Sequence, residues 1–154
     1  MPELIHLSRF HIVQDKRPLR RAYLEGFKEP IEFGVHGGIK HFYRMEPERD
    51  VPSTLDYVVG AVAGGMTGTL AGMLEARQIP SHPDRLLADV EGFIEAVDGK
   101  PRITRVKVHY TVKVPKGKRD AAERALEIHE QHCPVSQSVR RGIEVEFDGE
   151  VLEE

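Results

Sequence analysis

The chain has 154 residues, 40% of them apolar, which suits one globular domain with a hydrophobic core. Its net charge of −3 provides no basic surface for nucleic acid or for an anionic membrane, so we expect neither partner. Cys133 is the only cysteine, which excludes an internal disulfide, and the first ten residues do not read as a signal peptide. We therefore expect a single domain over residues 1–154, located in the cytoplasm.

The N-terminal third predicts a small antiparallel sheet. Turn residues separate three short apolar runs, at residues 4–13, 20–27 and 31–35. His36 and His41 follow these runs and flank Gly37-Gly38, which we interpret as a turn with solvated imidazoles. No further metal ligand is suggested by their spacing.

A long helix is predicted over residues 54–77. Ser53 is a suitable N-cap, and Asp56 lies three residues later, as in a capping box with Asp in place of Glu. Pro80 requires the helix to end before it, because the residue preceding a proline is disfavoured in the helical region.

Glycines recur along this helix, and each costs about 1 kcal/mol relative to alanine, so that some close contact must offset them. A neighbouring helix, a second copy of the chain or a ligand would provide that contact. Residues 57–74 carry no charge, which also permits a membrane span, but few large aliphatic residues and no basic N-terminal flank favour a buried core helix. The glycines are Gly60, Gly64, Gly65, Gly68 and Gly72.

The second half of the chain predicts a β-hairpin, two helices and a final strand. Together with the first half, this order predicts an α+β fold with the long helix on a sheet face. In the second strand, apolar residues alternate with polar ones, as in a half-buried strand. The predicted segments are strands 85–96 and 103–114 around a turn at 98–101, helices 118–132 and 134–141, and strand 143–147.

Cys133 stands at the junction of the two predicted helices. Because Pro134 suits the first position of a helix, Cys133 would be its N-cap, with the sulfur near unpaired N–H groups that favour a thiolate. His129 lies one turn earlier and His132 is adjacent, so either imidazole could also favour the thiolate. The alternatives are that Cys133 is a small buried apolar residue, that His129 packs between helices and that His132 is solvated.

Two segments resemble motifs of the OsmC/Ohr superfamily. Cys133-Pro134-Val135-Ser136, after an Ala-rich helix, is similar to the second-cysteine motif, and the segment 54–65 is similar to the helix that carries the first cysteine. The resemblance implies an OsmC-like α+β fold, with antiparallel sheets around a long central helix, in an intertwined homodimer. In that family a pair of thiols reduces organic hydroperoxides.

This sequence departs from the family at the first cysteine. Gly65 stands at that position, and Leu55 and Asp56 stand near the place of the family's Pro-x-Glu motif. A two-cysteine cycle within one subunit therefore cannot operate. The family's arginine partner has no assignable counterpart among the candidates Arg17, Arg20 and Arg21.

The resemblance places Gly65, Asp56, His129 and Ser136 around a pocket. We expect Gly65 to enlarge the space for an apolar small molecule, which the protein would bind without turnover. The alternative is a one-cysteine, thiol-dependent hydroperoxide reductase using Cys133, and the third possibility is a purely structural role.

No cofactor or metal is expected. His129, His132 and Cys133 supply three ligands at most, whereas closed zinc sites usually have four. The glycines of the long helix also lack the Gly-x-x-x-x-Gly-Lys-Ser/Thr pattern of a phosphate loop.

Overall fold

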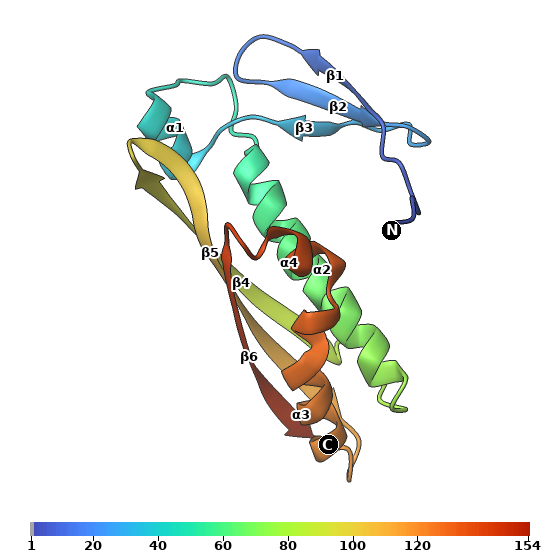
Figure 1. Ribbon diagram of the computed structural model, residues 1–154. Helices are drawn as coiled ribbons and strands as arrows, with labels where there is room; N and C mark the ends of the chain where they lie inside the picture. The colour runs from blue at the N-terminus through green and yellow to red at the C-terminus, as the bar shows by residue number, and fades with distance from the viewer. Residues whose placement is uncertain (1) are drawn as a thin grey trace. The chain divides into compact units, whose positions relative to one another are not determined.

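The N-terminal strands form the antiparallel sheet that the sequence predicted. The computed structural model describes residues 2–154 and divides into one unit up to Tyr57 and another from Val58 to Glu154 (Figure 1). In the first unit the strand order is β1-β2-β3, with β2 paired to both neighbours. The strands are β1 (Phe10–Gln14), β2 (Arg20–Leu24) and β3 (Ile31–Phe33).

The segment after β3 is a helix, α1 (Gly37–Tyr43), where the sequence had predicted only a turn. Gly37, the first residue of α1, has a φ of +52°, so the chain turns at this residue as it enters the helix, and the N–H of Lys40 donates to the carbonyl of His36. Arg44 ends the helix in the left-handed region. The two glycines therefore begin a helix in place of closing a turn.

The long helix is α2 (Thr54–Glu75), and its predicted capping box is confirmed. The N–H of Asp56 donates to Oγ of Ser53 at 3.1 Å, and the N–H of Ser53 donates to Oδ2 of Asp56 at 2.7 Å. Gln78 adopts a φ of +59° and ends the helix region before Pro80. Five α2 side chains are buried: Val62, Ala63, Met66, Leu70 and Leu74.

By length and composition alone, α2 is the one helix within residues 2–154 that could cross a membrane. Core helices of soluble proteins meet the same criterion, and α2 is buried along one face only, with 28% of its apolar stretch buried in this chain, where the sequence predicted a buried core helix. The structure therefore gives no preference to a membrane span.

In the second unit, β4 (Leu86–Val97) and β5 (Lys100–Val114) form the predicted hairpin. Asp98 and Gly99 both have positive φ angles, as in the tight turns that suit the twist of a hairpin. The alternating residues of β5 face the interior as predicted, and the buried set is Ile103, Val106, Val108, Tyr110, Val112 and Val114.

The last strand, β6 (Glu144–Glu153), pairs with β5 in parallel, so the second sheet has the order β4-β5-β6. A parallel neighbour requires a crossover, which the intervening helices supply. The predicted helix 118–132 is interrupted: α3 (Arg119–Ile128) is followed by a 3₁₀ turn, η1 (His129–His132), and then by α4 (Pro134–Val139).

Candidate functional site

Cys133 is the N-cap of α4, as the sequence predicted. Its Sγ accepts a hydrogen bond from the N–H of Ser136 at 3.4 Å. The side chain is fully buried in the single chain. An N-cap position favours a thiolate, but burial keeps this sulfur away from solvent and from a peroxide. The geometry thus matches the interpretation of Cys133 as a small buried residue.

Gly65 lies directly beside this sulfur. A Cβ placed on Gly65 would lie 3.3 Å from Sγ of Cys133 and 3.0 Å from Cγ2 of Val135. The expectation that Gly65 enlarges a pocket is therefore not met, because Val135 and Cys133 occupy the space that the absent side chain leaves. The contact nevertheless brings together two positions 68 residues apart, the two that resemble the family's cysteine positions.

His129 is fully buried and packs as a structural side chain. Its Nδ1 lies 2.6 Å from the carbonyl of Leu126 and its Nε2 lies 3.1 Å from the hydroxyl of Tyr110. Because a carbonyl only accepts, Nδ1 carries the proton, and the tyrosine hydroxyl donates to Nε2. Burial lowers the pKa of His129, so its neutral form is favoured. His132, in contrast, is exposed.

Tyr110 is a member of this cluster that the sequence analysis did not identify. Its ring and that of Phe147 both meet the imidazole of His129 edge to face, with centroid distances of 5.2 and 4.7 Å. Burial raises the pKa of Tyr110, and a charged Cys133 nearby would raise it further, whereas a hydrogen bond with Thr67 opposes the shift. The sequence could have indicated Tyr110, because it lies in the buried row of β5 and a buried tyrosine hydroxyl needs a hydrogen-bond partner.

Ser136 is buried and is bonded to Glu130. Its Oγ donates to Oε2 of Glu130 at 2.5 Å, and Nε2 of Gln137 donates to the same oxygen at 2.7 Å. These contacts join η1 to α4 on either side of Cys133. Ser136 therefore helps to fix the position of the cysteine.

Asp56 belongs to the first unit, where it binds His36. Nε2 of His36 lies 2.6 Å from Oδ2 of Asp56, the same oxygen that accepts from Ser53. Burial alone would raise the pKa of Asp56, but the hydrogen bonds from Ser53 and His36 outweigh it and hold that pKa below its usual value. The structure thus assigns Asp56 to a helix cap joined to α1 by His36.

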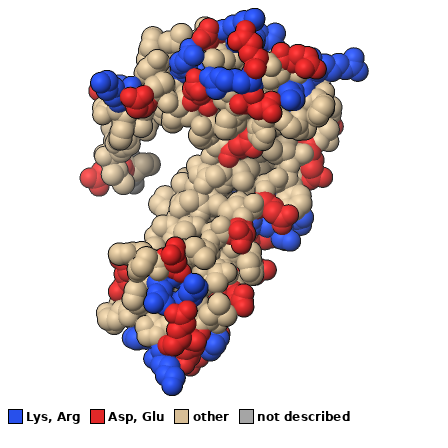
Figure 2. Space-filling view, turned by 180° about the vertical axis from the view of Figure 1, so that it is seen from behind, with Lys and Arg blue, Asp and Glu red and all other residues tan. Residues whose placement is uncertain are grey.

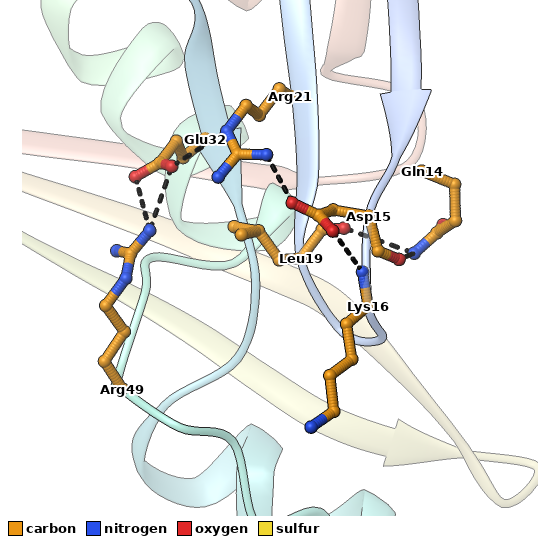
Figure 3. Close-up of polar contacts among 7 residues, drawn as sticks. All are labelled: Gln14, Asp15, Lys16, Leu19, Arg21, Glu32 and Arg49. Carbon is orange, nitrogen blue, oxygen red and sulfur yellow. Dashed lines mark hydrogen bonds and ion pairs between the residues drawn. The ribbon is translucent and has the colours of Figure 1, made fainter.

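The candidate arginines have partners within the first unit or face solvent. Figure 3 shows Arg21 between Asp15 and Glu32, with Arg49 on the same Glu32 carboxylate at 2.9 and 3.0 Å. Arg20 donates to the carbonyl of Pro18, and Arg17 is exposed.

Within residues 2–154, no group of three or more His, Cys, Asp or Glu side chains is placed to hold an ion. A hollow of about 630 Å³ lies elsewhere on the second sheet. None of the predicted site residues lines it; its lining includes Asp89, Lys107, His109, Glu146 and Asp148.

Residues 47–148 match the sequence model of the protein family described as "OsmC-like protein". The chain belongs to this family. No curated protein matches the sequence. The assignment agrees with the elements described above, in particular with Cys133 at the start of α4 and Gly65 opposite it on α2.

Solved OsmC-like structures share the fold over nearly their whole length. An OsmC-like protein from Mycoplasma pneumoniae is 12% identical, with a TM-score of 0.74, and the match covers 97% of this chain and 99% of that one. An OsmC-like protein of unknown function from Vibrio cholerae is 12% identical, with a TM-score of 0.75 and coverage of 95% and 100%. The organic hydroperoxide resistance protein OhrB of Bacillus subtilis is 11% identical, with a TM-score of 0.63 and coverage of 94% and 98%.

These identities are low, so the structural matches establish the α+β OsmC-like fold and nothing finer. Both the hydroperoxide resistance protein and the protein of unknown function share it. A shared fold does not determine chemistry, which depends on the residues of the site.

Proposed function

We propose that this OsmC-like protein is not a two-cysteine hydroperoxide reductase, and that it forms a homodimer that binds an apolar small molecule. The observation that carries the first part is the contact between Gly65 and Cys133. Only one of these two adjacent positions has a sulfur, and a Cβ on the other would lie 3.3 Å from it. A sulfenic acid on Cys133 would have no partner thiol within its own chain.

The exposed face of α2 supports the dimer. A Cβ on Gly60, Gly64, Gly68 or Gly72 would have no neighbour within 4 Å in the described chain. Four interior glycines cost a helix about 4 kcal/mol relative to alanine, so a contact outside the chain is needed to offset them. Figure 2 shows an uncharged band along α2 (Figure 1), which suits burial against a second copy.

The same face supports an apolar ligand. Charged side chains are absent from α2 between Asp56 and Glu75, and the glycines leave the helix backbone accessible. A neutral, apolar molecule bound there would lose no hydration of charged groups on the protein. The ligand site would be closed by the second copy.

Peroxidase chemistry is tested by organic hydroperoxide consumption with a dithiol reductant present. Wild type and Cys133→Ser are compared, and oxidation of Cys133 is followed by intact mass. We expect no turnover by either protein and a thiol that stays reduced. Turnover by wild type that is lost in Cys133→Ser would contradict the proposal and establish a one-cysteine reductase, the alternative that the N-cap position of Cys133 favours.

The dimer is tested by light scattering coupled to gel filtration. Gly64→Leu and Gly68→Leu each place a large side chain on the exposed face of α2. Glu127→Leu is the control, because it places the same side chain at an exposed position of α3. We expect a dimer for wild type and for the control, and a monomer for both glycine variants. A monomeric wild type would refute the dimer.

Ligand binding is tested by titration with Nile red, a neutral apolar dye. Fluorescence should rise with wild type and with Glu127→Leu but not with Gly64→Leu. An equal response from all three proteins would show that the dye does not bind the α2 face.

A further inference from the structure

The turn that leads into Cys133 is held by the packing of His129 and by the hydrogen bonds of Glu130 to Ser136 and Gln137. Of the four residues of η1, only His129 is buried, while the N–H of Cys133 donates to the carbonyl of Glu130 at 3.1 Å. A 3₁₀ turn has poorer hydrogen-bond geometry than an α-helix, so its own backbone holds it weakly. The packing of His129 is therefore the contact that anchors this turn in the core, while Glu130 ties it to α4.

The surroundings of His129 suit a neutral imidazole. The hydroxyl of Tyr110 on β5 donates to one nitrogen, the carbonyl of Leu126 on α3 accepts from the other, and Phe147 on β6 covers the ring. Among the described residues, Glu130 of η1 is the charge that favours the protonated form. Its carboxylate is already bonded to Ser136 on α4.

Apart from Glu130, no charged side chain among residues 2–154 shifts the pKa of His129. Thr67 of α2 contacts Tyr110 and is neutral. The charged neighbours of Phe147 on β6 lie on the opposite face of the sheet, where Glu146 pairs with Arg105 and Asp148 pairs with His109. A proton on His129 would thus create a charge in a site built from one hydroxyl, one carbonyl and two aromatic rings.

We propose that protonation of His129 opens the η1 turn and exposes the Cys133 thiol. A buried imidazolium that is bonded only to a neutral carbonyl and a neutral hydroxyl is unfavourable, because no carboxylate bonds to it, and opening of the four-residue turn returns it to water. Opening the turn breaks the hydrogen bond from the N–H of Cys133 to the carbonyl of Glu130, so Cys133 is displaced and its sulfur leaves its position beside Gly65 and the N–H of Ser136. Acidification would thereby convert a buried thiol into one that can react.

The size of the effect follows from proton linkage. Burial lowers the pKa of His129 in the closed state, whereas the open state has an ordinary imidazole. Below about pH 6.5 the open state binds one more proton, and the opening equilibrium rises about tenfold per pH unit until the closed state is also protonated.

The experiment is the reaction of Cys133 with 4,4′-dithiodipyridine between pH 7.5 and 4.5. The rate at each pH is divided by that of the urea-unfolded protein, which removes the dependence of the reagent and of the thiolate on pH. The inverse of this ratio is the protection of Cys133. In wild type the protection should fall about tenfold per pH unit below pH 6.5. Far-UV circular dichroism at each pH shows whether the protein remains folded.

Two variants distinguish opening caused by protonation of His129 from a general sensitivity of the protein to acid. His129→Gln keeps a side chain that can hydrogen-bond but does not titrate, and its protection should be independent of pH. His132→Gln removes an exposed imidazole of the same turn, and it should retain the wild-type slope. Constant protection in folded wild type, or loss of the slope in His132→Gln, would overturn the proposal. The wild-type result decides the matter even if His129→Gln does not fold.

Discussion

A disulfide between positions 65 and 133 should form when Gly65 is replaced by Cys. In a disulfide, each Cβ lies about 3.0 Å from the partner sulfur, and a Cβ on Gly65 would lie 3.3 Å from Sγ of Cys133. A bridge that closes a loop of about 70 residues stabilises by about 4 kcal/mol in the chain-entropy description. Displacing Val135, which would lie 3.0 Å from the new Cβ, costs about 1–3 kcal/mol. We expect a net gain of about 2 kcal/mol in the oxidised protein.

The assay is thermal unfolding of Gly65→Cys with and without reductant, after oxidation during refolding, together with intact mass to detect the bridge. Gly64→Cys is the matched control, because a Cβ at that position has no neighbour within 4 Å. We expect the bridge in Gly65→Cys only. A Gly65→Cys protein that remains reduced, even when combined with Val135→Ala, would refute the placement of α4 against α2.

Four further predictions concern buried or capping groups. The free energy of unfolding should decrease as the pH falls below about 6.5, because the pKa of His129 is lowered in the folded protein and the unfolded chain takes up the proton first. Urea titrations of wild type and of His132→Gln should show this decrease equally. Tyr110→Phe leaves Nε2 of His129 without its donor and should cost about 1–3 kcal/mol by urea unfolding. Ser53→Ala removes the cap of α2 and should lower the free energy of unfolding by about 1 kcal/mol. Because the pKa of Asp56 is lowered in the folded protein, the stability that Asp56 contributes should be lost only as the pH falls below about 4. Thermal melts of wild type and Asp56→Asn across this pH range measure that loss.

Asp56 illustrates how far local sequence predicted the candidate site. The Ser53-x-x-Asp56 spacing predicted the cap correctly, because a capping box is formed within four consecutive residues. Its second partner, His36, lies 20 residues earlier and was interpreted as solvated. The pairing depends on α1, a helix that the Gly37-Gly38 pattern did not predict.

The sequence alone determined the elements whose signals are local. The capping box starts α2, Asp98-Gly99 closes the β4–β5 hairpin, alternation identifies the buried row of β5, and Pro134 makes Cys133 an N-cap. Each of these follows from the conformational preferences of adjacent residues.

Only the tertiary structure decided how space is filled around them. It placed Val135 and Cys133 where Gly65 leaves room, joined Tyr110 to His129, and made β6 parallel to β5. These contacts join residues far apart in the chain, and they depend on the volumes that neighbouring side chains occupy. Residue type and spacing do not encode those volumes, because packing in a core is a property of all the surrounding side chains together.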